Sequence, residues 1–169
     1  MGRLSLIQHS APLQSAKLLK TTIDRIAYAT DLRKTSEDAL AWAVHIAKAN
    51  EADLLLLHVL PPPVPLFEAE PFEKPEAEVA LSLLLARVKA TGISSRGFLL
   101  TGTDSIGKQI VRAATLEKID LILMGTQSRS RIFRLLTGSV AANVVAQAQC
   151  PVLVIPCKPS KHGLSRIHR

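Results

Sequence analysis

Short apolar runs alternate along the chain with stretches in which apolar residues recur at helical spacing. Four runs, at residues 25–30, 53–60, 120–124 and 152–155, are almost continuously apolar. This pattern is typical of parallel strands that helices cover on both faces. A fifth run, at residues 93–100, is more polar and suits a strand at the edge of a sheet.

Helical spacing occupies the segments between these runs. Residues 35–50, 75–91, 104–118 and 137–149 are predicted as helices. The first begins in the sequence Thr-Ser-Glu-Asp, whose hydroxyl and acidic side chains suit a helix N-terminus. Asp104 is the predicted N-cap of the third. The alternation of strands and helices predicts an α/β fold with a parallel sheet and right-handed crossovers.

The length of 169 residues, of which 47% are apolar, is sufficient for one domain with a full core. We find no internal repeat and no linker that would divide the chain. We therefore expect a domain at residues 23–157, an N-terminal arm at 1–22 and a C-terminal tail at 158–169. Aromatic residues make up only 4%, so the core is predicted to be aliphatic, and the single tryptophan, Trp42, is expected to pack on a helix face.

The net charge of +7 comes entirely from the two ends of the chain. Residues 1–20 contain three basic residues and residues 158–169 contain four, and neither segment contains an acidic residue. The stretch between them carries 14 basic and 14 acidic residues. Because the expected domain is neutral overall, we do not expect it to bind nucleic acid.

Neither a membrane span nor a signal peptide is predicted, because no apolar run approaches the required length of about 18 residues and polar residues interrupt the N-terminus. The two cysteines, Cys150 and Cys157, flank the last predicted strand. An extended strand holds them roughly 20 Å apart, whereas a disulfide needs Cα atoms within about 7 Å. Two free thiols agree with a reducing compartment, so we expect a cytoplasmic protein.

Three loops follow predicted strands at the end of the sheet where parallel α/β folds bind ligands. The first contains Ala29, Thr30 and Asp31, the second contains Gly102, and the third covers residues 125–139. Asp31 is interpreted as a polar contact to a ligand bound there, with a catalytic acid or base as the alternative.

The third loop has the composition of a phosphate-binding site. Gly125 allows a sharp turn off the strand, and the small residues after it leave backbone N–H groups open to an anion. Three arginines, Arg129, Arg131 and Arg134, supply positive charge. The Gly-Ser pair at 138–139 opens a helix whose N-terminal amides favour phosphate. A structural loop with solvated arginines has a similar composition, so composition alone leaves both interpretations open.

Spacing connects this loop to a known family. Gly125 is followed by two residues, Ser128, nine residues, and then the Gly-Ser pair. This resembles the nucleotide-binding signature of the universal stress protein family, in which a glycine stands at the position of Ser128. Residues 26–40, 55–59 and 140–156 resemble the opening strand and helix, the second strand, and the closing helix and strand of that family. The resemblance covers about residues 23–157.

The resemblance implies a five-stranded parallel sheet of order 3-2-1-4-5 with helices on both faces, a Rossmann-like fold of the adenine nucleotide α-hydrolase-like type. It also implies a cytoplasmic homodimer that acts in the stress response and, in one branch, binds ATP or another adenine nucleotide with Mg²⁺ held through the phosphates. The first loop and Val59 would contact the adenosine moiety, and the third loop the phosphates. The nucleotide-binding residues implied in this way are Ala29, Thr30, Asp31, Val59, Gly102, Gly125, Thr126, Gln127, Ser128, Arg129, Ser130, Arg131, Gly138, Ser139 and Val140.

Two other function classes remain open. Because the second branch of the family has lost the loop pattern, Ser128 favours the alternative of a nucleotide-free dimeric interaction module. An enzyme is the other alternative, but we find no Walker loop, dinucleotide fingerprint or nucleophile elbow. We name no catalytic residue and expect at most slow ATP hydrolysis. An unidentified protein partner is expected for a regulatory protein.

Two further side chains are interpreted as structural. His58 lies between apolar residues of a predicted buried strand, so we expect a hydrogen-bonded histidine in the core or at the sheet end rather than a ligand or base. Cys150 precedes a proline at the start of an apolar strand, so we expect an inert buried thiol.

The last predicted strand indicates how the chain assembles. Its four residues Val152, Leu153, Val154 and Ile155 are apolar on both faces, and the proposed order places them at a sheet edge. An apolar edge exposes unpaired backbone groups unless something covers it. We predict an isologous homodimer in which two copies pair this strand antiparallel. The alternative is that the basic tail folds back over the strand.

Overall fold

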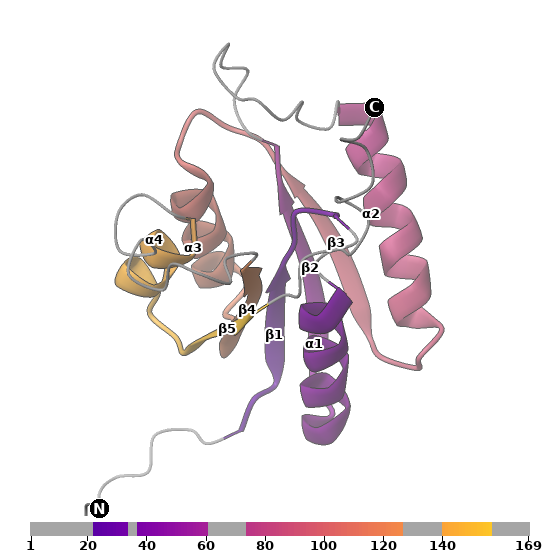
Figure 1. The fold of residues 1–169 in the computed structure, drawn as a ribbon. Helices are drawn as coiled ribbons and strands as arrows, with labels where there is room; N and C mark the ends of the chain where they lie inside the picture. Colours follow the sequence, from indigo (N-terminus) through magenta and orange to yellow (C-terminus); the bar gives the residue numbers. More distant parts are fainter. Residues whose placement is uncertain (1–21, 34–36, 61–73, 127–139, 157–169) are drawn as a thin grey trace, which may run out of the picture.

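In the computed structural model, five strands form one parallel sheet in the order β3-β2-β1-β4-β5 (Figure 1). The structure describes residues 22–33, 37–60, 74–126 and 140–156. The strands are β1 (Arg25–Ala29), β2 (Asp53–Val59), β3 (Ser95–Leu100), β4 (Leu121–Thr126) and β5 (Val152–Pro156). The predicted α/β class and the order 3-2-1-4-5 are confirmed.

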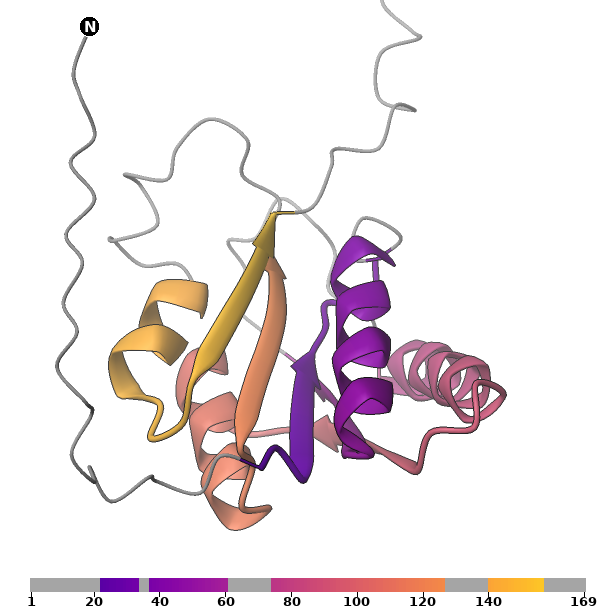
Figure 2. The same cartoon turned by 90° about the horizontal axis from the view of Figure 1, so that it is seen from below.

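Two helical layers enclose the sheet (Figure 2). One face is covered by α1 (Glu37–Asn50) and α2 (Lys74–Lys89), and the other by α3 (Ile106–Leu116) and α4 (Val140–Gln147). Successive side chains of a strand point to opposite faces, so the continuous apolar runs supply both layers at once. Within β2, Leu54 and Leu56 pack toward α1 and α2, whereas Leu55 and Leu57 pack toward α3 and α4.

The edge strands are more exposed than the three central ones. In β3, Arg96 and Gly97 are exposed, as the more polar run predicts. In β5, residues Val152 to Val154 are half-buried and Ile155 is buried. Of the described helices, none is long and apolar enough to cross a membrane.

Trp42 differs from its predicted packing position. The buried face of α1 consists of Ala39, Leu40, Ala43 and Ala47, and Trp42 lies beside that face with half of its surface exposed. Its ring contacts His45 edge-on, with ring centroids 6.1 Å apart. The expectation that Trp42 packs against the domain is therefore wrong, because α1 approaches the sheet through its alanines.

Gly125 also differs from its prediction. Instead of turning off the sheet, Gly125 and Thr126 continue β4, where they pair with Ile155 and Pro156 of β5. Among the described glycines only Gly92 has a positive φ, of 85°. The neighbouring strand keeps β4 extended, so the turn predicted at Gly125 does not occur there.

The start of α3 required another correction. Ser105, not Asp104, is its N-cap, and the Ser105 side chain accepts a hydrogen bond from the Lys108 N–H. The carbonyl of Asp104 instead accepts from Gln109 Nε2 at 2.8 Å. Both residue types are good caps; here Ser105 caps the helix, while Asp104 binds Gln109 of the same helix.

Candidate functional site

The order of the strands reverses direction at β1. From β1 the chain continues to β2 and β3 on one side, whereas β4 and β5 lie on the other side of β1. Ligands bind at such a reversal point in open parallel sheets. Ala29 is paired with Met124 here, so Thr30 and Gly125 are the next residues on the two adjacent strands. Neither Ala29 nor Gly125 adds a bulky side chain to this end of the sheet.

Thr30 is held by three hydrogen bonds immediately after β1. Its N–H donates to the Leu57 carbonyl at 2.9 Å, and its Oγ1 accepts from the Leu32 N–H at 3.0 Å. His58 Nδ1 lies 2.8 Å from the Thr30 carbonyl oxygen. Because a carbonyl oxygen can only accept, Nδ1 carries the proton of this bond. These bonds tie the first loop to the end of β2.

His58 is therefore buried and hydrogen-bonded at the sheet end, as predicted. Its contact with the loop after β1 was not predicted. The apolar neighbours of His58 indicate burial, but no sequence signal identifies the carbonyl that it meets 28 residues away.

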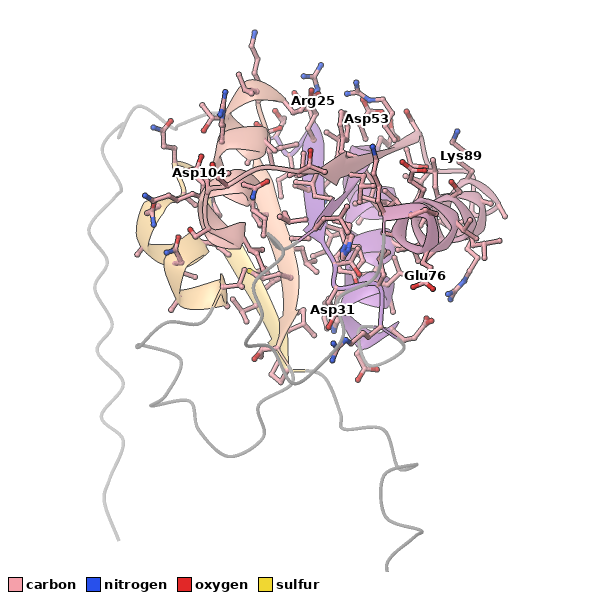
Figure 3. The ribbon with its side chains drawn as sticks, turned by 90° about the horizontal axis from the view of Figure 1, so that it is seen from above. Arg25, Asp31, Asp53, Glu76, Lys89 and Asp104 are labelled. Carbon is pink, nitrogen blue, oxygen red and sulfur yellow. The ribbon has the colours of Figure 1, made fainter. Side chains whose placement is uncertain are left out.

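Asp31 presents a carboxylate at this end of the sheet. Figure 3 shows it at the end opposite Arg25 and Asp53, the first residues of β1 and β2. The side chain is exposed, and its Oδ1 accepts from the Arg33 N–H at 3.0 Å. Leu32 between them has a φ of 59°, so the loop turns tightly and keeps the carboxylate at its tip.

An apolar wall lies at the same end of the sheet, on the face of α3 and α4. Ala29, Val59 and Met124 belong to one buried cluster, and Val140, the first residue of α4, packs against it. Three predicted site residues, from β1, β2 and α4, thus belong to this cluster or pack against it. Such a wall can hold one side of a flat apolar group while the Asp31 carboxylate accepts hydrogen bonds from its polar substituents.

Gly102 lies at the same end but under a different strand. It is exposed in the loop from β3 to α3, and its carbonyl oxygen lies 3.4 Å from Gln109 Nε2. In the sheet, β3 is separated from β1 by β2. The structure therefore places Gly102 in the loop that leads to α3, not in the wall formed by Ala29, Val59 and Val140.

The position of α4 depends on a close contact with α3. A Cβ built on Gly107 would lie 2.6 Å from Asn143 Oδ1 and 2.9 Å from Asn143 Cβ. Only a glycine allows the two helices to approach so closely. Sequence reasoning missed Gly107, because a glycine near a helix start has no signature of the helix that it will meet.

The rest of the predicted phosphate loop lies outside the described residues. These residues are Gln127, Ser128, Arg129, Ser130, Arg131, Arg134, Gly138 and Ser139. Across the described ranges, no group of three His, Cys, Asp or Glu side chains is arranged to hold a metal ion.

Cys150 lies at the opposite end of the sheet from Asp31. It precedes β5, is half-buried and is a free thiol. Burial raises the pKa of the thiol, and the nearby Asp120 carboxylate adds to this effect. A raised pKa keeps the sulfur protonated, which agrees with the interpretation of an inert thiol.

Comparisons with known proteins agree with this geometry. Residues 22–156 match the model of the universal stress protein family. A universal stress protein of Methanocaldococcus jannaschii is 38% identical over 88 residues, which are 52% of this chain and 50% of that protein. One of Thermus aquaticus is 37% identical over 117 residues, which are 64% of this chain and 80% of that protein. This chain thus spans half the length of the first relative.

A solved structure shares both the fold and part of the sequence. It is a universal stress protein in complex with cAMP, 25% identical, with a TM-score of 0.64 over 81% of this chain and 99% of that one. The family match covers all five strands and four helices of the described fold. The chain therefore belongs to the universal stress protein family.

Proposed function

We propose that this chain is a stress-response regulatory protein that binds an adenine nucleotide at the carboxyl ends of β1 and β4. The observation that carries the proposal is that Ala29 and Val59 belong to one apolar cluster against which Val140 packs, and that the exposed Asp31 carboxylate lies at the same end of the sheet. These are residues that the family resemblance assigns to the nucleotide. The solved relative in complex with cAMP supports an adenine nucleotide as the ligand class.

The described residues fit the adenosine half of the ligand. Val59 and Ala29 supply apolar contact for the base, and Asp31 accepts hydrogen bonds from amino or hydroxyl groups. Thr30 keeps the loop in place through its bonds to Leu57 and His58. The phosphates are assigned to the segment from Gly125 to Val140 on its spacing and its arginines.

We propose ATP with Mg²⁺ as the preferred ligand. A triphosphate carries more negative charge than a single phosphate, and the three arginines of the loop can neutralise that larger charge. The metal would be held through the phosphate oxygens and would neutralise their charge. The chain's own residues are assigned to binding and not to turnover. We assign no catalytic group, and slow hydrolysis of ATP is the most that we expect.

Calorimetric titration with ATP, AMP and cAMP, each with and without Mg²⁺, tests the proposal. We expect Asp31→Asn to weaken binding about tenfold, since one hydrogen bond to a charged group is lost. Asp104→Asn, a change in another exposed aspartate at the same end, is expected to leave affinity unchanged. Gly138→Val is expected to abolish binding because a side chain would occupy the phosphate site, whereas Gly163→Val in the tail is not.

The outcomes separate the alternatives. Unchanged affinity in Gly138→Val would show that the phosphates are placed wrongly. No binding at millimolar nucleotide would overturn the proposal. It would favour the nucleotide-free interaction module, which Ser128 in place of the family glycine makes the second candidate.

We further propose a cytoplasmic homodimer that pairs the outer edges of two β5 strands and presents the nucleotide state to a protein partner. At that edge, no strand other than β4 pairs with β5 among the described residues. An uncovered apolar edge strand promotes association, and the free thiol of Cys150 agrees with a reducing compartment. We assign these functions to residues 23–157 and none to the two ends.

A further inference from the structure

The largest apolar side chain on the described surface lies next to the β5 edge. Trp42 is 50% exposed and lines an open groove with Asp38, Ala41 and His45 of α1 and with Ile155 and Pro156 of β5. The groove has a volume of about 720 Å³. Exposed tryptophan beside an apolar strand is typical of an interaction surface.

The groove exists because the helical layer ends before the sheet does. On this face, α1 is centred on β1 and β4 and also contacts β2 and β5. Leu153 and Ile155 of β5 point to the same face as α1. On the β5 side of α1, no other described helix covers this face of the sheet (Figure 2). The second helix of this layer, α2, lies on the other side of α1, toward β3. Within the described ranges, the outer flank of β5 and the side of α1 that carries Trp42 are therefore left uncovered together.

The free edge of β5 is continuous with this groove. The Pro151 carbonyl accepts a hydrogen bond from the Ile122 N–H of β4. Successive residues of a strand direct their backbone groups to alternate sides, so Leu153 and Ile155 also face β4. Val152 and Val154 then direct their N–H and C=O groups away from the sheet, where a further strand can pair with them.

We propose that the interface between two copies of this chain extends from β5 onto α1, with Trp42 of each copy closing over the paired β5 strands. This inference rests on the proposed dimer and adds a surface to it. Two β5 strands related by a two-fold axis perpendicular to the sheet keep both α1 helices on one face. Each copy then offers the same groove to the other.

Spacing explains why a large side chain is needed there. Neighbouring strands lie about 4.8 Å apart, so an α1 centred between β1 and β4 is about 10 Å from the axis. The two α1 helices would be about 20 Å apart, whereas directly packed helices lie about 8–10 Å apart. The remaining gap over the paired strands can be filled by the two indoles. The edge-on contact with His45 holds the Trp42 ring on this flank of the helix.

The observations favour a second copy over the chain's own tail as the occupant. The tail at 158–169 carries four basic and no acidic residues. Asp38 is the only acidic residue among those that line the groove in the described part of the chain. The occupant must be apolar, to fill the groove, and must have a free strand edge, to pair with β5. The β5 strand of a second copy meets both requirements.

Trp42 is the only tryptophan of the chain, so its fluorescence reports on this groove alone. Acrylamide quenching and the emission maximum would be measured from submicromolar to high micromolar concentration, with light scattering on the same samples. We expect emission to shift to the blue and quenching to fall several-fold as the dimer forms. Trp42→Ala should raise the dimer dissociation constant at least tenfold, whereas Val79→Ala, at an exposed position of α2, should not change it.

The readouts distinguish failure of this inference from failure of the proposed function. A dimer whose Trp42 is quenched equally at all concentrations would overturn the inference and leave the dimer intact. A monomer at every concentration would overturn both the dimer and the inference, while nucleotide binding is measured separately. Trp42 could instead be protected from acrylamide at every concentration and lose this protection when residues 157–169 are removed. That result would show that the tail occupies the groove and would overturn the inference.

Discussion

At the residue scale, the loop after β1 is shaped by backbone groups rather than by charge. Thr30 forms hydrogen bonds with Leu57, Leu32 and His58, each no longer than 3.0 Å. Buried backbone groups must find partners because leaving one unpaired costs about 1–3 kcal/mol. The carboxylate of Asp31 is thereby left exposed at a fixed loop, which is the arrangement that a ligand contact requires.

Cys150 offers a prediction at the same scale. Because burial raises the pKa of its thiol, little thiolate is available at neutral pH. In a Cys157→Ser variant, we expect iodoacetamide to modify Cys150 several-fold more slowly in the folded protein than in the same variant unfolded by urea. Mass spectrometry over time measures both rates. Equal rates would contradict the interpretation of an inert thiol.

At the element scale, α4 is positioned by its contact with α3 at Gly107. We expect Gly107→Ala to reduce the free energy of unfolding by about 1–3 kcal/mol, because the new methyl group would overlap the Asn143 side chain, including its Cβ. Nucleotide affinity should fall as well, since α4 begins with Val140 at the proposed site.

Two further variants separate overlap from other causes. Gly102→Ala should change stability little, because the nearest atom, at 3.4 Å, belongs to the end of the Gln109 side chain. Adding Asn143→Gly to Gly107→Ala should recover part of the nucleotide affinity by removing the overlapping atoms. Urea unfolding measures the change in stability, and calorimetry measures the change in nucleotide affinity. An unchanged affinity in Gly107→Ala would show that the position of α4 does not affect the proposed site.

The ion pair between α1 and α2 provides a pH-dependent prediction. Arg87 donates two hydrogen bonds, of 2.9 and 2.8 Å, to the Glu37 carboxylate and lowers its pKa, and both side chains are more than half exposed. A lowered pKa makes the contribution of this pair present above the ordinary glutamate range and lost as pH falls through the lowered value. We expect Glu37→Gln to reduce stability by at most about 1 kcal/mol at neutral pH.

Urea unfolding at neutral and acidic pH, at low and high salt, measures this difference. The gap between wild type and Glu37→Gln should close below the glutamate range and narrow in high salt. Glu78→Gln is the matched control, because Glu78 meets Lys74 within α2 at 4.0 Å and links no second helix. A gap that persists in acid would show that the carboxylate charge is not its source.

At the scale of the whole molecule, the sheet has one apolar edge that the described part of the chain leaves open. We expect Val154→Asp to convert the proposed dimer to monomers, because a carboxylate beside the paired edge would have to lose its water. Light scattering at tens of micromolar, with circular dichroism to verify folding, measures the effect. Val154→Thr, which keeps the shape without the charge, should remain dimeric. A monomeric wild type would contradict the assembly.

Much of this molecule follows from local pattern. The continuous apolar runs predicted β1, β2 and β4, and the more polar run correctly predicted an edge strand at β3. A continuous apolar run is sufficient to predict these strands, because burial on both faces requires apolar residues at every position of a strand. Ala29, Thr30, Asp31 and Val59 could likewise be placed at strand ends, because a loop that follows a parallel strand has only one end of the sheet available to it.

What only the tertiary structure decided are the contacts between distant segments. Gly125 continues β4 because β5 pairs with it. The N–H groups of Asp24 and Arg25 bond to the Asp120 carboxylate, which lies 96 and 95 residues away. Gly107 against Asn143 and the uncovered Trp42 depend on the same kind of proximity. The local pattern of apolar residues predicts which strands are buried. Which residues contact one another depends on how the fold brings distant segments together.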